Sequence, residues 1–431
     1  MADTAHKDYQ YMEEHHDSES ELTAKVDRLA RYVRDASHMI AFTGAGISTS
    51  AGIPDFRGPD GKWTCQAQGR VGPQGKSTLC ALPTPTHMSL VALQQHGILK
   101  HLVSQNCDGL HRRSGFPTAA LSELHGNGNV EECEDCGQQY YRDAKCRRAG
   151  GRGRDHATGR RCVREGCGGR LLEWTIDFGQ DLPMAPLEAA QHHASRADLC
   201  LAMGSSLTVT PAAGIPEAVG RRRKDRLVIV NLQKTPLTGV ADFQIFARTD
   251  VVMQMLMQRL GLAVPPFKLR RRVELSATPQ APQASGAAPG ATLDVRARGV
   301  DLEDPSLPVS ILRSVVATSD GVAHAPRLQA EDDGAGAHTM RLPASDAPQK
   351  QLTLSFPGHY SEPPVTVPVA PLLAAGRLCL DLEYDPAVGA WAMTRCDEGA
   401  TGDAAVVQAS RPRDNRFGVS HREYVNQGKK K

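Results

Sequence analysis

The sequence TGAGISTSAGIPDFRG, at residues 43–58, follows an apolar run, Met39–Phe42, that predicts a short buried strand. Closely spaced glycines after a strand let backbone N–H groups approach a phosphate that a Cβ would keep away. The first two glycines match half of the dinucleotide pattern G-x-G-x-x-G, but Thr49 stands at the third glycine position. This spacing fits either a phosphate-binding loop or a plain turn. The rigid turn, carboxylate, aromatic ring and cation of Pro54–Arg57 favour a ligand-binding loop.

The composition describes a multidomain protein without a membrane-spanning or secretory signal. The chain has 431 residues, with 50 Lys and Arg against 48 Asp and Glu, and its length suggests two or three domains. It contains no apolar run of about 18 residues, and its polar N-terminus lacks the apolar core of a signal peptide. We therefore expect a cytosolic or nuclear protein whose 11 cysteines are thiols or metal ligands rather than a disulfide framework.

Helical and strand patterns alternate over the first 264 residues. Ser18 and Glu21 match a helix capping box, and an amphipathic helix follows them. Further strands are predicted at 98–103, 199–203 and 227–230, and each runs into small or polar residues. This alternation predicts an α/β fold with a parallel, doubly wound sheet, which binds ligands at the carboxyl ends of its strands.

Two cysteine pairs lie in the middle of this region. Cys133 and Cys136 are separated by two residues, and Cys162 and Cys167 by four. Four thiolates delivered by two tight turns are what a structural tetrahedral zinc ion needs, so we expect these four residues to bind Zn²⁺. Unrelated free thiols are the alternative. The wider second spacing and the nearby Cys146 leave the ligand set open.

The remaining segments differ in composition from the α/β region. Residues 1–17 are expected to be disordered, and residues 265–300 read as a Pro/Ala/Gly-rich linker. Short strand-like runs at 301–408 suggest a small all-β module, and residues 409–431 form a basic tail. The α/β domain is therefore expected at 18–264, with the zinc module at about 130–170.

Several motifs occur together in a fixed order: GAGIS with IPDFRG, QNCDGLH, the histidine of HGN, the two cysteine pairs, GSS and VNLQ. As an ordered set over residues 20–264 they resemble the sirtuin family of NAD-dependent protein deacylases, and most closely its nuclear class IV branch. The resemblance implies a Rossmann-like parallel sheet with a small inserted zinc-binding domain. It also implies a cleft between the two that holds NAD and an acyl-lysine peptide.

The resemblance assigns roles to individual residues. His125 would be a general base, since an unperturbed histidine pKa of about 6.5 suits proton transfer near neutrality. Asn106 and Asp108 would complete the catalytic set, and Phe178 and Gly179 would line the acyl-lysine channel. The residues matched to NAD, besides these three catalytic ones, are Gly44, Ala45, Gly46, Thr49, Ile53, Asp55, Phe56, Arg57, Trp63, Gln105, Gly204, Ser205, Ser206, Asn231, Leu232, Gln233 and Thr249.

Each of these residues also has a simpler interpretation. Alone, His125 would be read as a surface or capping histidine, and Ser205 and Ser206 as helix caps. Trp63 fits a packing anchor as well as a ligand cover. Cys107 stands among site residues like a nucleophile, but a buried packing thiol is the better interpretation.

The resemblance implies an enzyme that consumes NAD and releases nicotinamide, O-acyl-ADP-ribose and a deacylated lysine. Its expected substrates are acyl-lysine proteins of the histone or other nuclear class, in the nucleus or nucleolus, with no membrane partner. Two alternatives are a protein mono-ADP-ribosyltransferase and a chromatin- or nucleic-acid-binding scaffold with weak NAD-dependent activity. The basic runs at 221–224, 270–272 and 429–431 fit solvated surface, nuclear import or nucleic-acid contact.

Overall fold

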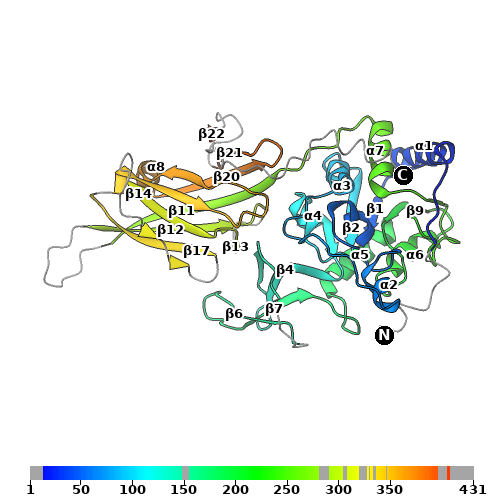
Figure 1. Cartoon of the computed structure of the whole chain (residues 1–431), viewed down its shortest axis with the longest axis horizontal. Coiled ribbons are helices and arrows are strands. Elements are labelled where there is room, and N and C mark those ends of the chain that lie inside the picture. Colours follow the sequence, from blue (N-terminus) through cyan, green and yellow to red (C-terminus); the bar gives the residue numbers. More distant parts are fainter. Residues whose placement is uncertain are drawn as a thin grey trace.

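Figure 1 shows the computed structural model of the chain. An α/β region and a β-rich C-terminal region lie side by side, and a smaller group of strands lies beside both. The structure describes residues 13–147, 155–280, 291–303, 308–319, 328–329, 331–332, 336–345, 347–396 and 405–407.

A six-stranded parallel sheet forms the centre of the α/β region. Its strand order is β10-β9-β8-β1-β2-β3, so β1 lies between β8 and β2 and the order reverses there. Ligands of such sheets bind in the crevice at this reversal. The Rossmann-like prediction is therefore confirmed, with strands β1 (Met39–Thr43), β2 (Leu99–Ser104), β3 (Leu121–Glu123), β8 (Leu199–Met203), β9 (Arg226–Val230) and β10 (Phe243–Ile245).

Helices cover both faces of this sheet through two separate apolar cores. Ser18 caps α1 in the predicted capping box, and Val26, Leu29, Ala30 and Val33 of that helix are buried at helical spacing. The first core joins α1 (Glu19–Asp35), α3 (Pro85–Gln95) and α7 (Thr249–Leu260). The second joins α5 (Met184–Arg196) and α6 (Gly214–Gly220). Shorter helical segments are η3 (Ala45–Ala51), α2 (Lys62–Ala67), α4 (Leu110–Arg113) and η4 (Thr118–Ala120).

The cysteine region forms a small antiparallel module inserted between β3 and α5. Its strands are β4 (Gly126–Cys133), β5 (Gln139–Arg142), β6 (Ala157–Arg161) and β7 (Arg170–Thr175). Because β4 begins three residues after β3 ends, the module starts directly at the edge of the parallel sheet.

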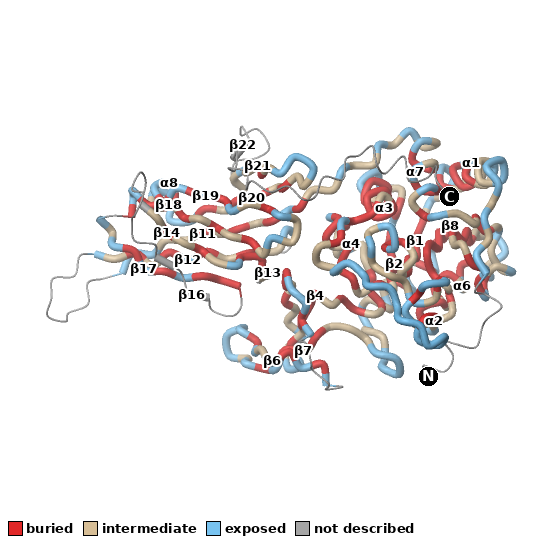
Figure 2. Tube along the Cα trace, viewed as in Figure 1, coloured by how far each residue is buried: buried red, intermediate tan, exposed pale blue. Residues whose placement is uncertain are grey.

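The C-terminal region is a two-sheet β-sandwich with one apolar core. One sheet carries β16, β17, β12, β11, β20, β21 and β22 and continues through β13 into β5, β4, β7 and β6 of the cysteine module. The other sheet carries β15, β14, β18 and β19. Figure 2 shows buried positions alternating with intermediate or exposed ones along these strands. The elements are β11 (Leu269–Gln280), β12 (Thr292–Val300), β13 (Pro308–Ser310), β14 (Ser314–Ser319), β15 (Leu328–Gln329), β16 (Glu331–Asp332), β17 (Ala337–Pro343), η5 (Ala347–Gln349), β18 (Lys350–Ser355), β19 (Val365–Pro368), α8 (Val369–Ala375), β20 (Arg377–Asp385), β21 (Ala390–Arg395) and β22 (Ala405–Val407).

The structure corrects the prediction that residues 265–300 form a linker. β11 and β12 run through this region as paired central strands of the sandwich. The reason is a period-two pattern in which Leu269, Val273 and Leu275 are buried between charged neighbours. The most Ala- and Pro-rich part, at 281–290, lies outside the described residues.

Two further expectations need correction or restriction. The predicted disorder of residues 1–17 is wrong at its C-terminal end, because Asp17 accepts hydrogen bonds from Lys25 (2.6 Å) and the Phe246 amide (2.9 Å). A disulfide joins Cys379 to Cys396, against the expectation of thiols and metal ligands only. Residues 1–12 and the predicted basic tail at 409–431 lie outside the described part of the chain. None of the helices in the described part of the chain combines the length and hydrophobicity that spanning a bilayer requires.

A stack of histidines lies between β2 and α5. The rings of His101 and His193 are parallel with centroids 4.2 Å apart, and His38 Nε2 lies 3.1 Å from His193 Nδ1. Burial lowers the pKa of His38 and His193, and that of His101 to about 3. Below about pH 6.5 these histidines bind protons in the unfolded chain, whereas burial disfavours their protonation in the folded protein. Their contribution to the free energy of unfolding is therefore fully present above about pH 6.5 and is lost as the pH falls.

We therefore expect the melting temperature to fall between about pH 7.5 and about pH 5.5, and His193→Gln to make that fall smaller. Exposed His96, at the end of α3 and outside the stack, is the matched control, since His96→Gln should leave the pH dependence unchanged. Melting curves of the three proteins at both pH values test this. Equal pH dependence in all three would contradict it.

Candidate active site

The glycine loop after β1 packs directly against the loop after β8. The Gly46 amide donates a hydrogen bond to the Gly204 carbonyl (2.8 Å). A Cβ at Gly44 would lie 2.7 Å from Gly204 O, and one at Gly46 would lie 2.8 Å from Gly204 Cα. Gly204 itself has a φ of +59°. The glycines are thus required by the contact of two backbones at the reversal of strand order.

Asn106 and Asp108 follow β2 and are fixed by this loop. Ser48 Oγ donates to Asp108 Oδ2 (2.7 Å), and the Leu110 amide donates to Asp108 Oδ1 (2.9 Å). Asn106 Nδ2 donates to the Gly44 carbonyl (3.2 Å). Both side chains are more than nine-tenths buried. Ser48 is a site residue that the sequence assignments missed, although it lies within the GAGIS motif.

His125 follows β3 and faces the same edge of the sheet. Its Nδ1 lies 3.1 Å from the Gln105 carbonyl, which can only accept, so Nδ1 carries the proton and Nε2 has a free lone pair. Burial lowers the pKa of His125, and the hydrogen bond to Gln105 opposes that shift. Gly126 must be glycine, because its φ is +73° and a Cβ would lie 2.0 Å from the Trp174 carbonyl.

Gln105 connects the loops after β2, β3 and β8. Besides its carbonyl contact with His125, its Oε1 accepts a hydrogen bond from Ser205 Oγ (3.1 Å). Its Nε2 is buried without a hydrogen-bond partner among the described residues. A buried amide donor without a partner is costly, so this atom suits a ligand that brings an acceptor.

Three aromatic side chains form a partly exposed wall near the glycine loop. The ring of Trp63 lies 4.6 Å from that of Phe56 and 5.5 Å from that of Phe178. The Arg57 guanidinium stacks on Trp63 at 4.6 Å. Phe56 and Phe178 are 42% and 53% exposed. Trp63 therefore joins the predicted NAD-binding residues to the predicted acyl-lysine channel.

Asp55 shapes its own loop. The Gly58 amide donates to Asp55 Oδ1 (3.0 Å), and a Cβ at Gly58 or Gly61 would lie 2.5 or 2.6 Å from the carboxylate. Burial raises the pKa of Asp55. The carboxylate is therefore bonded within its own turn.

The other predicted residues lie at the ends of β8 and β9 or beside the glycine loop. Asn231 Nδ2 donates to the Gln233 carbonyl (2.9 Å), and Gln233 Nε2 donates to the Arg57 carbonyl (3.3 Å). Ser206 Oγ lies 2.9 Å from Thr208 Oγ1. Thr249 is buried at the start of α7 and accepts from Thr86 Oγ1 (3.1 Å).

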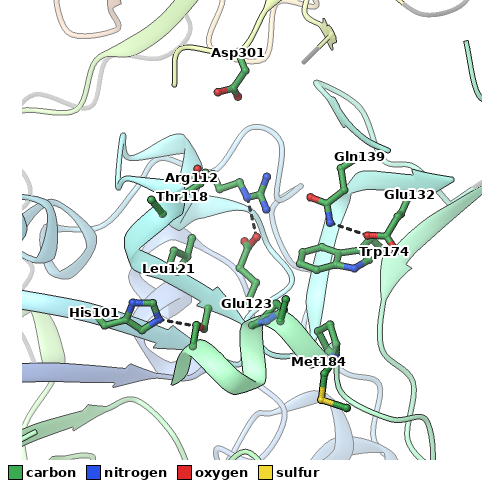
Figure 3. A pocket seen from close by; sticks show the side chains of 16 residues that line it. His101, Arg112, Thr118, Leu121, Glu123, Glu132, Gln139, Trp174, Met184 and Asp301 are labelled. Atoms are coloured by element: carbon green, nitrogen blue, oxygen red, sulfur yellow. Dashed lines mark hydrogen bonds and ion pairs between the residues drawn. The ribbon is translucent and has the colours of Figure 1, made fainter. Parts of the chain in front are cut away.

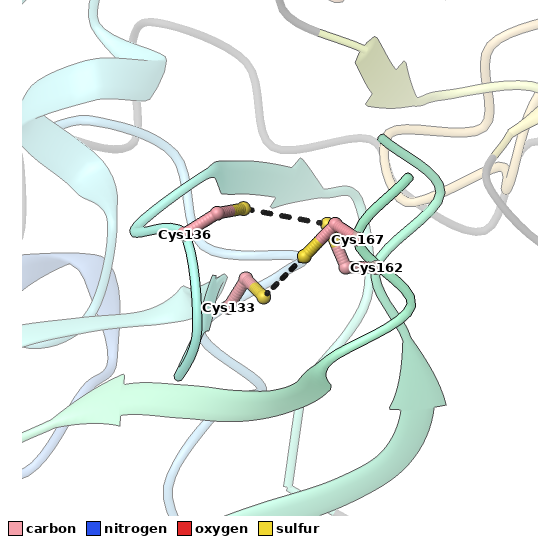
Figure 4. A group of neighbouring side chains, drawn as sticks. All are labelled: Cys133, Cys136, Cys162 and Cys167. Carbon is pink, nitrogen blue, oxygen red and sulfur yellow. Dashed lines mark hydrogen bonds between the residues drawn. The ribbon is translucent and has the colours of Figure 1, made fainter. Parts of the chain in front are cut away.

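Cys133, Cys136, Cys162 and Cys167 form a cluster whose sulfur atoms all lie within 4.8 Å of one another (Figure 4). Two of the S···S distances are 3.6 and 3.7 Å. A tetrahedral zinc ion with Zn–S bonds of about 2.3 Å places sulfurs about 3.8 Å apart, so the cluster fits Zn²⁺.

Cys146 was considered as a zinc ligand and Cys107 as a nucleophile, and the structure supports neither role. Cys146 lies outside the four-sulfur cluster. Burial raises the pKa of Cys107 to about 12, and its thiol donates to the His125 carbonyl (3.0 Å). Cys107 is therefore a packing thiol, as expected, because a nucleophile at neutral pH must be a thiolate.

A separate cavity of about 610 Å³ is lined by residues of β2, β3, the cysteine module and α5 (Figure 3). Arg112 and Glu123 form an ion pair of 2.8 Å on its wall, and Trp174 lines it. None of the predicted NAD or zinc residues lines this cavity.

Known proteins of similar sequence point to the same kind of site. The family model described as "Sir2 family" matches residues 74–211. The chain is 42% identical over 257 residues to NAD-dependent protein deacetylase SRT1 from Arabidopsis thaliana, covering 59% of this chain and 53% of that protein. It is 44% identical over 261 residues to NAD-dependent protein deacetylase sirtuin-7 from Homo sapiens, covering 58% and 64%.

NAD-dependent protein deacetylase Sirt6 from Drosophila melanogaster is 36% identical over 258 residues, covering 58% of this chain and 80% of that protein. The chain thus spans about half the length of the Arabidopsis relative and most of the Drosophila one. The residues matched by the family model contain β2, β3 and β8 of the parallel sheet, the cysteine cluster and His125. The chain belongs to the Sir2 family.

Proposed function

We propose that this protein is an NAD-dependent protein-lysine deacylase. The observation that carries the proposal is the state of His125. Its Nδ1 is committed to the Gln105 carbonyl, and its Nε2 is left as a base at the edge of the sheet where Asn106 and Asp108 lie. The relatives named above are called NAD-dependent protein deacetylases, which supports the same activity.

The residues around the glycine loop fit NAD. Gln105 Nε2 is a buried donor without a partner among the described residues, and Gly44 and Gly46 bring the glycine loop into close contact with the Gly204 backbone. We assign Asp108, Ala45 and Ile53 to the nicotinamide end. Ser206, Asn231 and Gln233 would hold the adenosine end, with the remaining predicted residues between the two ends. Each oxygen of Asp108 accepts one hydrogen bond in the structure and keeps a second lone pair.

Bound NAD supplies the ADP-ribosyl group that receives the acyl group when nicotinamide departs. The protein's contribution is positioning and proton transfer. His125 accepts a proton at Nε2, and its lowered pKa keeps it neutral and able to do so at pH 7. The aromatic wall of Phe56, Trp63 and Phe178 would cover one side of the site when a ligand is bound.

We further propose that the cysteine cluster holds a structural Zn²⁺. The four thiolates fill a tetrahedral shell and leave no position for substrate, so the ion would hold the module together without taking part in the reaction.

The proposed substrates are acyl-lysine side chains of histones or other nuclear proteins, and the proposed location is the nucleus. The basic runs offer limited support for nucleic-acid contact. Arg222 donates to three backbone carbonyls, and Arg271 is buried against Asp143. Arg223 and Lys224 are exposed and are the better candidates for such contact.

The proposal is tested by incubating the full-length protein with an acetyl-lysine histone-tail peptide, with and without NAD. We expect deacetylated peptide only when NAD is present, as followed by mass spectrometry of the peptide. ADP-ribose attached to protein without deacetylation of the peptide would instead support the transferase. Absence of both products across a panel of acyl groups would contradict the enzymatic proposal.

A further inference from the structure

The β-sandwich contacts both halves of the catalytic unit at one end. β13 pairs in parallel with β5 of the cysteine module, which places Val309 opposite Tyr141. Arg271 forms a buried ion pair with Asp143 at the end of β5. On the α/β side, the Thr118 amide donates to the Glu303 carboxylate (2.8 Å). The sandwich is therefore packed against the catalytic unit at more than one point.

One contact reaches the segment that lies over the glycine loop. We define the covering segment as residues 59–83, between that loop and α3. The Tyr360 hydroxyl, on the loop after β18, donates to the Ala81 carbonyl (3.0 Å). Burial raises the pKa of Tyr360 to about 12, so the hydroxyl keeps its proton at neutral pH. The Tyr360 ring packs against Phe267 at 5.5 Å.

A second side chain holds the same end of the covering segment. Arg113, on α4, donates from Nη1 to the Thr78 carbonyl (2.6 Å) and lies beside the Tyr360 side chain. Arg113 is 8% exposed. Ala81 is thus held by a residue of the sandwich. Thr78, a few residues earlier in the chain, is held by a residue of the catalytic domain.

From this anchor the covering segment leads directly onto the glycine loop. The Lys76 amide donates to the Gly52 carbonyl (2.8 Å). A Cβ at Gly75 would lie 2.4 Å from Pro54 Cδ, so the Gly75 backbone packs against the Pro54 ring. Ala81 lies only a few residues from this contact. Loss of the hydrogen bond at Ala81 should therefore loosen the covering segment where it meets the glycine loop.

We propose that Tyr360 is a positioning residue for NAD binding, which acts by holding Ala81 and so keeping the covering segment on the glycine loop. This proposal rests on the proposed NAD-dependent function. It gives the C-terminal sandwich a defined part in the reaction, since a side chain far along the sequence fixes a wall of the cofactor cleft.

The test compares Tyr360→Phe with Tyr32→Phe in the full-length protein. Phenylalanine keeps the Tyr360 ring but removes its hydroxyl, which bonds to both the Ala81 carbonyl and the Arg113 side chain. Tyr32 is the control, because its hydroxyl accepts hydrogen bonds from Arg28 of the same helix, α1. For Tyr360→Phe we expect the KM for NAD to rise about fivefold, as the loss of these hydrogen bonds allows, with kcat within about twofold of wild type.

Limited trypsin digestion gives a readout that is independent of activity. Lys76 is exposed within the covering segment, and we expect its cleavage to be about fivefold faster in Tyr360→Phe than in wild type. Tyr32→Phe should match wild type in both assays, and the melting temperatures of all three should lie within about 4 °C of one another. Unchanged KM and unchanged cleavage at Lys76 in Tyr360→Phe would overturn the proposal, as would equal effects of both substitutions. An inactive wild-type protein would overturn the proposed function, and the digestion would still test the anchor.

Discussion

Replacing His125 with alanine should lower kcat/KM for deacylation by about 10²–10⁴-fold, the usual contribution of a positioned general base. The expected loss is large because Nε2 of His125 is the proposed base at the edge of the sheet where Asn106 and Asp108 lie. The hydrogen bond from Nδ1 to the Gln105 carbonyl fixes the orientation of the ring. The fold should survive, since His125 is only partly buried. Steady-state kinetics with NAD and an acetyl-lysine peptide measure the effect.

The pH dependence gives a second signature of the same residue. Burial lowers the pKa of His125 below its ordinary value of 6.5, so the neutral base persists to lower pH than in a free histidine. The acid limb of the kcat/KM profile should therefore have its midpoint below about pH 6.5. His96→Ala, at an exposed position at the end of α3, is the matched control and should behave as wild type. Equal activity of the two alanine variants would remove His125 from the mechanism.

Removing the metal should unfold the cysteine module and lower the melting temperature by about 10 °C or more, because structural zinc sites contribute several kcal/mol or more to folding. The sulfurs of Cys133 and Cys167 lie 3.6 Å apart, as two ligands of one ion would. In the proposed site the ion links the two turns that carry the cysteines, and its removal breaks that link. The module also supports β13 of the sandwich, so its unfolding should loosen that contact too. Melting curves with and without a strong chelator, and zinc content by mass spectrometry, measure both effects.

Cys146 provides the control for that experiment. It is buried in the same module but lies outside the cluster. Cys133→Ser should lose bound zinc, whereas Cys146→Ser should retain it. Retention of zinc by Cys133→Ser together with its loss from Cys146→Ser would show that the ligand set is wrong.

The α/β part of the fold could be predicted because its signals are local. Each strand is a short apolar run, the capping box at Ser18 marks the first helix, and polar residues follow the strands. Parallel pairing then brings the ends of β1, β2 and β8 to one edge. The missed strand β11 shows the limit of this approach. Its buried residues alternate with charged ones, including an arginine that is itself buried, and this pattern resembles a polar linker.

The details of the site depend on contacts between distant segments, which no local pattern contains. Gly44 is held against Gly204, and Asp55 is committed to Gly58 of its own turn. The contact of Tyr360 with Ala81 joins residues 279 positions apart. Sequence patterns could therefore nominate the residues around the cleft. They could not separate those that face a ligand from those that shape the loops.

The most direct test of the central claim is the stoichiometry of products. The wild-type protein, NAD and an acetyl-lysine peptide should yield nicotinamide, O-acetyl-ADP-ribose and deacetylated peptide in equal amounts, measured together by mass spectrometry at several times. This ratio is expected because one acyl group is transferred for each NAD consumed. Release of nicotinamide with free ADP-ribose or ADP-ribosylated protein, and no O-acetyl-ADP-ribose, would contradict the assignment as a deacylase.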